Sequence, residues 1–321
     1  MQIWDHAIYV GDDTLRFKML HFISHPDYDI PLPKGHRFPA RKFTSLMDRL
    51  IKAGVVKGGR LSHARPAPKD TLAKVHAPHY IQAIAEGTLN KEALRQLGLP
   101  WSEALAKRSF LAVEGTYRTA LKALNFGLAC HGAGGTHHAH HDYGAGFCVF
   151  NDMAYTASRL IDEGRVQSVL ILDVDVHQGD GTARILSGDD AVFTCSIHCA
   201  DNYPHDKALS DLDVLVPAGT GDAGYRAIVQ DTLDDLAQRL SPDLVIYDAG
   251  VDVHEADALG RLALTDAGVM AREQAVLDFW LSRGVPVTTV IGGGYMPDFD
   301  HLMRLHMMVF QAAKDQFKRW C

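Results

Sequence analysis

The chain has 321 residues, of which 47% are hydrophobic, and it carries a formal net charge of −7 with a pI near 6.2. This length allows one large domain or two smaller ones, and the apolar fraction supplies ample material for a core. An acidic chain lacks the basic footprint of a nucleic-acid-binding protein, so we expect no nucleic-acid partner.

The composition also predicts where the protein works. Residues 1–6 lack the basic and apolar regions of a secretion signal. No stretch approaches about 18 uninterrupted apolar residues, so we expect no membrane span and no membrane partner. The five cysteines are odd in number and form no C-x-x-C pair, which argues against a disulfide framework. We therefore predict a cytoplasmic protein.

The amino-terminal half shows mainly helical periodicity. Its apolar spacing predicts helices over residues 39–53, 78–86, 102–126 and 151–163. Segments 25–37 and 55–75 are rich in Pro, Gly, His and Lys and are predicted to be surface loops. The Lys and Arg side chains between residues 41 and 60 are expected on a solvated face.

The carboxyl-terminal half alternates strand and helix patterns. Strands are predicted at residues 168–176, 191–198, 243–249 and 286–291. Helices are predicted at residues 224–240, 266–283 and 298–318. This alternation predicts an α/β fold in which a central, mostly parallel sheet is covered by helices on both faces. No repeat, linker or composition break divides the chain, so we predict one domain over residues 1–321.

A potential metal-binding motif follows the apolar stretch 168–172 and reads Asp173-Val174-Asp175-Val176-His177. In an extended strand alternate side chains share a face, so both carboxylates and the imidazole are expected on one side. Such groups are costly to bury unless a metal or another charge compensates them. Ligands of open α/β sheets bind at the carboxyl ends of strands, which is where this motif falls.

Asp252 follows the next buried-strand pattern and is expected to approach Asp175 and His177 across neighbouring strand ends. A lone Asp at a strand end is more often a cap, but the D-x-D-x-H spacing is far more specific. Two carboxylates and one imidazole, with positions left open for water and substrate, are typical of a catalytic zinc site. The same ligands would accept Fe²⁺, and the residues alone leave this choice open.

A histidine-rich tract reads Gly134-Gly135-Thr136-His137-His138-Ala139-His140-His141. Two adjacent histidines can have different roles if a different carboxylate holds each of them. Asp173 and Asp180 are available to hold His137 and His138. The last two histidines of the tract have no such partner in view, and we expect both to be exposed.

Three glycines, residues 292–294, precede Tyr295 at the end of the last predicted strand. They allow close approach of the backbone, but no Walker lysine or G-x-G-x-x-G follows, which argues against a nucleotide site. A tyrosine on such a loop could donate a hydrogen bond to a developing oxyanion. Cys148 is expected to be a small buried residue, because a nucleophile supplied by a metal needs no Cys–His dyad.

Together these motifs resemble the zinc-dependent histone deacetylase family of the arginase–deacetylase superfamily. The matching segments, in order, are residues 134–138, 146–152, 173–181, 249–252 and 292–295. The resemblance covers roughly residues 20–310 and, from Asp248 to Thr265, is closest to the class IV branch and its bacterial relatives. Arginases fit less well, because their binuclear manganese site needs a second D-x-D cluster, which is lacking around Asp252.

The resemblance implies an arginase–deacetylase fold and a set of metal ligands. Zn²⁺ would be bound by Asp175, His177 and Asp252. Family members also bind K⁺ near the zinc, and the residues involved here would be Asp173, Asp175, His177, Ser196 and Ile197.

The catalytic roles are implied in the same way. His138 would be the general base and later the acid, oriented by Asp180. His137 would assist electrostatically and be oriented by Asp173. Tyr295 would polarise the substrate carbonyl.

The implied substrate is N-ε-acyl-lysine in a protein or peptide, whose amide would be hydrolysed by metal-activated water. Gly146 and Phe147 would line the acyl-lysine tunnel, and Arg37 would line an inner channel for acetate release. The acyl group could be acetyl or longer, because class IV relatives include enzymes that prefer long acyl chains.

Two alternatives stay open. Acetylpolyamine amidohydrolases of the superfamily apply the same chemistry to acetylated polyamines, but they tend to carry a long insertion at the tunnel mouth, and none is obvious here. A non-catalytic acyl-lysine reader would require a decayed site, whereas every proposed ligand and catalytic residue is present. The sequence defines no oligomeric state.

Overall fold

The computed structural model describes residues 19–56 and 60–321. Residues 1–6, which bear the prediction that no secretion signal is present, lie outside the described residues. One eight-stranded sheet organises the chain, with the order β2-β1-β3-β8-β7-β4-β5-β6. All neighbouring strands are parallel. The strands are β1 (His21–Ser24), β2 (Leu61–His63), β3 (Leu128–His131), β4 (Val169–Asp173), β5 (Val192–Cys199), β6 (Leu212–Val216), β7 (Leu244–Asp248) and β8 (Val287–Val290).

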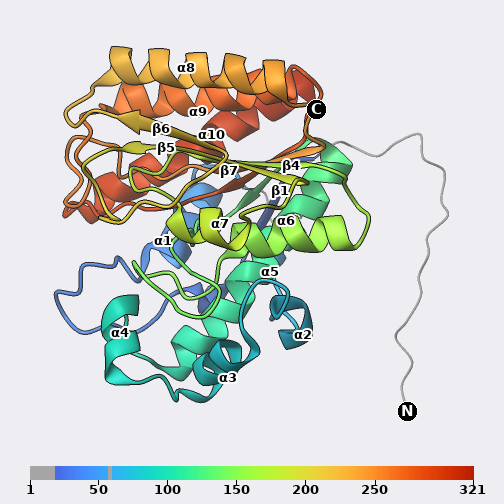
Figure 1. Ribbon diagram of the computed structural model, residues 1–321. Helices are drawn as coiled ribbons and strands as arrows, with labels where there is room; N and C mark the ends of the chain where they lie inside the picture. The colour runs from blue at the N-terminus through green and yellow to red at the C-terminus, as the bar shows by residue number, and fades with distance from the viewer. Residues whose placement is uncertain (1–18, 57–59) are drawn as a thin grey trace.

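Helices cover both faces of this sheet (Figure 1). In that view α8 and α9 lie above the strands and α10 passes behind them, whereas α5, α6 and α7 lie below them, with α2, α3 and α4 farther down. The helices are α1 (Lys42–Lys52), α2 (Lys69–Leu72), α3 (Pro78–Glu86), α4 (Lys91–Leu97), α5 (Glu103–Phe126), α6 (Asp152–Asp162), α7 (Asp180–Ile185), α8 (Asp222–Arg239), α9 (Asp266–Leu281) and α10 (Phe299–Trp320). A 3₁₀ turn, η2 (Pro26–Tyr28), follows β1.

The α/β fold predicted from the sequence is therefore confirmed. The central strands β4 and β7 are buried along their whole length, which explains their continuous apolar sequence in a sheet covered on both sides. Side-chain caps fix the starts of the long helices. Ser102 Oγ accepts from Leu105 N at 3.1 Å at the start of α5, and Asn151 Oδ1 accepts from Ala154 N at 2.9 Å at the start of α6.

All of the predicted helices and the four predicted strands are present, but several short elements were not predicted. Among them are β1, β2 and β3, which have only four, three and four residues. The segment 55–75, predicted to be a loop, contains β2 and α2. Among the described residues, no helix combines the length and the apolar character that a membrane span requires.

Candidate active site

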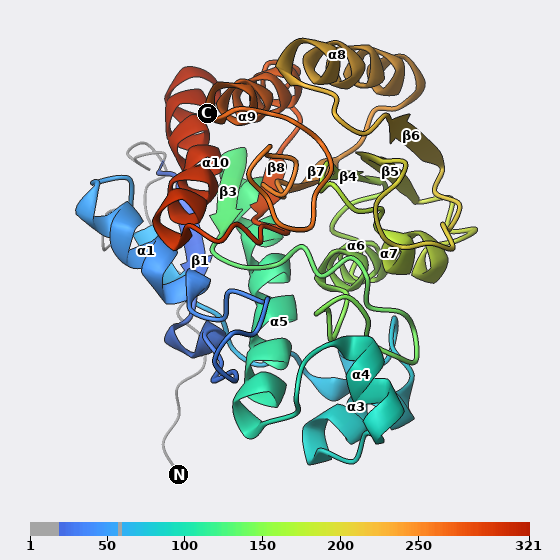
Figure 2. The ribbon, with the colours of Figure 1, turned by 90° about the vertical axis from the view of Figure 1, so that its left-hand side faces the viewer.

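The candidate site lies at the carboxyl ends of three adjacent strands. Figure 2 shows β8, β7 and β4 side by side in the sheet, as their order requires. Asp173, the last residue of β4, is in register with Asp248, the last residue of β7. The segments that follow these two strands and β8 therefore leave the sheet next to one another, and they carry five predicted site residues, Asp175, His177, Asp180, Asp252 and Tyr295.

Asp175, His177 and Asp252 form a fully buried group whose potential ligand atoms all lie within 4.8 Å of one another. His177 Nδ1 lies 3.0 Å from Asp175 Oδ1 and 3.1 Å from Asp252 Oδ2. The other carboxylate oxygens accept from backbone amides, Gly293 N at 2.7 Å and Val176 N at 2.9 Å. Burial opposes a charge on His177, but hydrogen bonds to the two carboxylates raise its pKa to about 10. The carboxylate pair thus attracts positive charge to this point.

Asp173 belongs to a second buried group, with His137 and Asp248. His137 Nδ1 lies 2.7 Å from Asp173 Oδ2. The prediction that the whole D-x-D-x-H motif shares one face of a strand is therefore wrong, because β4 ends at Asp173 and the chain then bends. The bend directs the other two members of the motif towards Asp252. The predicted convergence of these two residues with Asp252 across neighbouring strand ends is confirmed.

His138 is buried next to His137, with the ring centroids 4.1 Å apart. Its Nδ1 lies 2.6 Å from Asp180 Oδ1, at the start of α7. A carboxylate accepts this hydrogen bond, so Nδ1 carries the proton and Nε2 keeps a free lone pair. Burial and the neighbouring His137 lower the pKa of His138 to about 4, although Asp180 acts in the opposite direction. At neutral pH the ring can therefore accept a proton.

The prediction that His140 is exposed is wrong. The ring is buried, stacks on Tyr143 with a centroid separation of 4.3 Å, and places Nε2 3.0 Å from Asp180 Oδ2. One carboxylate therefore holds two histidines. This pair could not be predicted from a local pattern, because 40 residues separate His140 from Asp180 along the chain. His141 is exposed, as predicted, and its Nδ1 lies 3.0 Å from the carbonyl oxygen of Val75.

Asp152 fixes the loop that carries the tandem histidines, and sequence reasoning gave it no role. Its Oδ1 accepts from Thr136 N at 2.8 Å, and its Oδ2 accepts from Gly135 N at 3.2 Å. Thr116 Oγ1 also donates to Oδ2, at 2.6 Å. Gly135 has a φ of 79°. This conformation suits glycine, and the carboxylate holds it immediately before His137.

A cavity of about 390 Å³ leads to this cluster. Its inner lining includes His138, His177, Gly146, Phe147, Tyr203 and Tyr295. The ring of Phe147 lies 5.8 Å from that of Tyr295, and the ring of Tyr203 lies 4.8 Å from that of His138. Sequence reasoning missed Tyr203, which belongs to none of the motifs. Burial and nearby carboxylates raise the pKa of Tyr295 well above its usual value, so its phenol stays protonated and can donate.

A smaller inner cavity, of about 20 Å³, lies behind the tandem histidines and is bordered by Lys42 and Arg108. The prediction that Arg37 lines an inner channel is wrong, because Arg37 is exposed and borders the outer cavity. Lys42 also departs from the predicted solvated face: it is buried, and its Nζ donates to the carbonyl oxygen of Gly292 at 2.9 Å. Burial lowers the pKa of Lys42 to about 8.

Three of the five residues predicted to bind potassium lie on adjacent strands, and the other two, Asp175 and His177, follow β4. Asp173 on β4 is the register partner of Ser196 on β5, and Ile197 follows Ser196. Ser196 Oγ lies 2.9 Å from His198 Nδ1. The role of these residues towards K⁺ stays a prediction.

Cys148 is buried, as predicted. Burial raises the pKa of its thiol to about 12. The thiolate form needed for nucleophilic attack is therefore disfavoured at neutral pH.

A third group of potential ligands, His254, Asp266 and His301, lies away from the cavity. The backbone N–H of Ala256 donates to His254 Nδ1 at 3.1 Å, so the proton of a neutral ring sits on Nε2. That Nε2 lies 3.0 Å from Asp266 Oδ1, to which it can donate. The arrangement favours a hydrogen-bonded cluster over a metal site.

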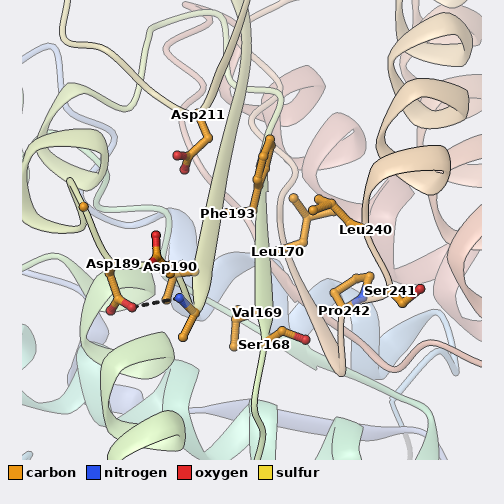
Figure 3. Close-up of a pocket in the computed structure, with 13 residues that line it drawn as sticks. Ser168, Val169, Leu170, Asp189, Asp190, Phe193, Asp211, Leu240, Ser241 and Pro242 are labelled. Carbon is orange, nitrogen blue, oxygen red and sulfur yellow. Dashed lines mark hydrogen bonds between the residues drawn. The ribbon is translucent and has the colours of Figure 1, made fainter.

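Another hollow, of about 220 Å³, lies at the opposite ends of the strands (Figure 3). It is bordered by the first residues of β4 and β5, Val169 and Val192, together with Asp189, Asp190 and Asp211. Asp189 Oδ1 accepts from Ala191 N at 3.0 Å. None of the predicted site residues borders this hollow, so the candidate active site is at the carboxyl ends.

Comparisons with known proteins place the chain in a family. The model of the histone deacetylase domain family matches residues 36–312. An uncharacterized protein of Picosynechococcus sp. is 46% identical over 295 residues, which cover 92% of this chain and 98% of that protein. Histone deacetylase 2 of Arabidopsis thaliana is 27% identical over 281 residues, which cover 84% of this chain and 73% of that protein. A probable deacetylase of Archaeoglobus fulgidus is 29% identical over 269 residues, which cover 78% of this chain and 73% of that protein.

Solved structures share the fold. The crystal structure of the HDA15 HD domain matches with a TM-score of 0.77 and 23% identity, covering 92% of this chain and 88% of that one. The structure of an HDAC homolog complexed with SAHA matches with a TM-score of 0.77 and 23% identity, covering 94% and 89%. From the family match over most of its length, this chain belongs to the histone deacetylase family and is a hydrolytic deacetylase with the arginase–deacetylase fold.

Proposed function

We propose that this deacetylase hydrolyses the amide of N-ε-acetyl-lysine in proteins or peptides, with Zn²⁺ held by Asp175, His177 and Asp252. The observation that carries the proposal is that His138, His177 and Tyr295 border the same cavity. The rings of His138 and Tyr295 lie 5.9 and 6.4 Å from that of His177. The proposed proton acceptor, metal ligand and hydrogen-bond donor are thus close together, as amide hydrolysis requires.

The buried donor set fits a divalent metal. Backbone amides hold one oxygen of each carboxylate, and the other oxygen of each lies within about 3 Å of His177 Nδ1. Zn²⁺ bound there would supply a nucleophile, by lowering the pKa of a bound water to about 7, and would polarise the carbonyl. The same ligands would accept Fe²⁺. For K⁺ we propose the neighbouring set Asp173, Asp175, His177, Ser196 and Ile197.

The chain's own residues would move the proton. His138 Nε2 would accept it from the attacking water and later pass it to the leaving lysine amine, while Asp180 keeps the opposite nitrogen protonated. Burial opposes a charge on His137, but Asp173 and Asp175 raise its pKa well above the usual value, so it would stay positive beside the reaction. Tyr295 would donate a hydrogen bond to the developing oxyanion.

The cavity suits an alkyl chain that ends in a small acyl group. Gly146 and Phe147, the predicted tunnel residues, border it together with Tyr203. Behind the tandem histidines only about 20 Å³ is free, little more than the roughly 10–15 Å³ that one water occupies by this measure. This size favours acetyl over a long acyl chain.

The test is hydrolysis of acetyl-lysine peptides, long-chain acyl-lysine peptides and acetylpolyamines by the zinc-loaded protein, with zinc content measured in parallel. We expect turnover of the acetyl-lysine peptides. Tyr295→Phe should keep its zinc and lose about 10²–10³-fold in kcat, as other enzymes do on losing an oxyanion donor. Preference for long chains would contradict the acetyl assignment. Zinc binding without turnover of any substrate would leave an acyl-lysine reader in place of the proposed hydrolase.

A further inference from the structure

The mouth of the 390 Å³ cavity carries a concentration of positive charge. Three arginines border it, Arg37, Arg95 and Arg261, and all three are exposed. The only acidic residue among the lining residues, all of which lie in the described part of the chain, is Asp201. The whole chain has a formal net charge of −7, so this rim has the opposite sign to the protein as a whole.

Among the described residues, the three guanidinium groups have no carboxylate partner. Within residues 19–56 and 60–321, neither an ion pair nor a side-chain hydrogen bond involves any of them. Some other arginines of the chain are paired with carboxylates, as Arg159 is with Glu114 at 2.8 Å. Like charges gathered at one rim repel one another, and an anionic ligand relieves this repulsion.

Two of the arginines lie on segments tied to the tunnel wall. Phe147 N donates to the carbonyl oxygen of Leu97 at 2.8 Å, which joins the wall to the end of α4, where Arg95 lies. His36 Nε2 lies 3.0 Å from the carbonyl oxygen of Gly98, which joins the same helix end to the loop that carries Arg37. The backbone segments that carry Arg37 and Arg95 are therefore held in place relative to the tunnel wall.

Arg261 is connected to the site through Asp257. Asp257 Oδ2 accepts from Tyr295 N at 2.7 Å, while its Oδ1 accepts from Leu259 N at 2.8 Å and from Gly260 N at 2.9 Å. The carboxylate therefore ties the loop just before Arg261 to the backbone of Tyr295. The backbone next to the third arginine of the rim is thus tied to the segment that carries Tyr295.

We propose that the rim of Arg37, Arg95 and Arg261 selects acyl-lysine in an acidic peptide context and disfavours acetylpolyamines. Guanidinium groups bind the carboxylates of Asp and Glu with two parallel hydrogen bonds. The ammonium groups that remain on an acetylpolyamine would instead meet charges of their own sign. This inference rests on the proposed function, because it concerns which substrate reaches the same cavity.

The first test compares three acetyl-lysine peptides of equal length, flanked by Asp, by Gln or by Lys. We expect kcat/KM for the Asp peptide to exceed that for the Lys peptide by about tenfold or more at low salt, within the range for electrostatically focused sites. The preference should fall to less than about threefold near 0.5 M salt, where screening acts within a few ångströms. Dissociation constants of fluorescent versions, measured with Tyr295→Phe, give a readout that needs no turnover.

The second test removes the rim. The triple variant Arg37→Gln/Arg95→Gln/Arg261→Gln should lose most of the difference between the Asp and Lys peptides, in turnover and in binding. The matched control is Arg226→Gln, an exposed arginine on α8, which lies at the far end of the molecule from α4 (Figures 1 and 2). This control should keep the wild-type preference.

The outcomes separate the two proposals. Equal binding of the three peptides, a preference of the wild type for the Lys peptide or an acetylpolyamine, or an unchanged preference in the triple variant would each overturn the rim inference. If no peptide is hydrolysed, the proposed function fails, and the binding constants still decide whether the rim selects acidic peptides.

Discussion

At the scale of single residues, one carboxylate determines what the candidate base can do. Asp180 holds His138 through one oxygen and His140 through the other. If His138 loses this partner, either ring nitrogen can carry its proton and the ring can turn. His140 restrains the Asp180 carboxylate and touches no reacting atom in the proposed reaction. We therefore expect it to act as a positioning residue.

We therefore expect His140→Ala to lower kcat by roughly tenfold, the smaller end of the range for residues that orient a catalytic group. KM should change little, because His140 does not border the substrate cavity. The adjacent, exposed His141→Ala is the matched control and should behave as the wild type. Steady-state kinetics of both variants, with melting temperatures, make the comparison. An equal fall in kcat in the two variants, or a rise in KM without a fall in kcat for His140→Ala, would refute the positioning role.

The same residues show how far sequence reasoning reaches. The D-x-D-x-H motif and Asp252 predicted the group of potential ligands, because residues that close a buried strand must meet at the sheet edge. Strand alternation wrongly placed Asp173 on the same face as the rest of the motif, since it assumed a strand that continues past that residue. The expected pairing of Asp173 with His137 is nevertheless present, at 2.7 Å. Contacts such as His140 with Asp180 depend on a loop path that no local pattern encodes.

At the scale of elements, the end of α4 shapes the tunnel wall. Gly98 caps this helix with a φ of 76°, and a Cβ added there would lie 2.9 Å from the Phe147 ring. Gly164, just after α6, has a φ of 63° and open space around its missing Cβ. The two glycines thus share a left-handed backbone but differ in their contact with the cavity.

This difference gives a matched pair of variants. Gly98→Ala and Gly164→Ala should each destabilise the protein by about 1 kcal/mol, from the left-handed backbone alone. Only Gly98→Ala should displace Phe147, and we expect it to lower kcat/KM for an acetyl-lysine peptide by roughly tenfold, since small misplacements of this kind are costly. Denaturant unfolding and peptide hydrolysis measure the two effects. Similar activity of the two variants would show that α4 does not define the tunnel.

Element prediction succeeded where the pattern was long and failed where it was short. The buried strands β4, β5, β7 and β8 lie between helices whose periodicity is clear, so the parallel sheet could be predicted. The strands β1, β2 and β3 offer at most four residues each and, unlike the equally short β8, they lack a run of β-branched residues that would distinguish them from a loop. Their place in the sheet depends on long-range pairing, which the local sequence does not contain.

At the scale of the whole molecule, the fold keeps several histidines buried and neutral. His76 is an example outside the proposed metal ligands: its Nδ1 lies 2.8 Å from the carbonyl oxygen of His140, and its Nε2 accepts from Asn151 N at 2.8 Å. Burial lowers the pKa of His76 to about 4, and burial likewise lowers that of His131 to about 4. Both rings are therefore neutral in the folded protein across the physiological range.

This pattern makes stability depend on pH in a defined window. The unfolded chain binds a proton at His76 below a pH of about 6.5, whereas the folded protein does so only near pH 4. The stability linked to His76 is therefore complete above pH 6.5 and is lost as the pH falls towards 4, at about 1.4 kcal/mol per pH unit. His76→Gln should be less stable than the wild type at pH 7 and lose stability less steeply on acidification.

Urea unfolding at several pH values measures, for each protein, the slope of the unfolding free energy against pH. Subtracting one slope from the other removes the contributions of all other groups. The exposed His79→Gln on α3 serves as the control and should keep the wild-type slope. Equal slopes for wild type and His76→Gln would mean that the folded protein binds this proton as readily as the unfolded chain.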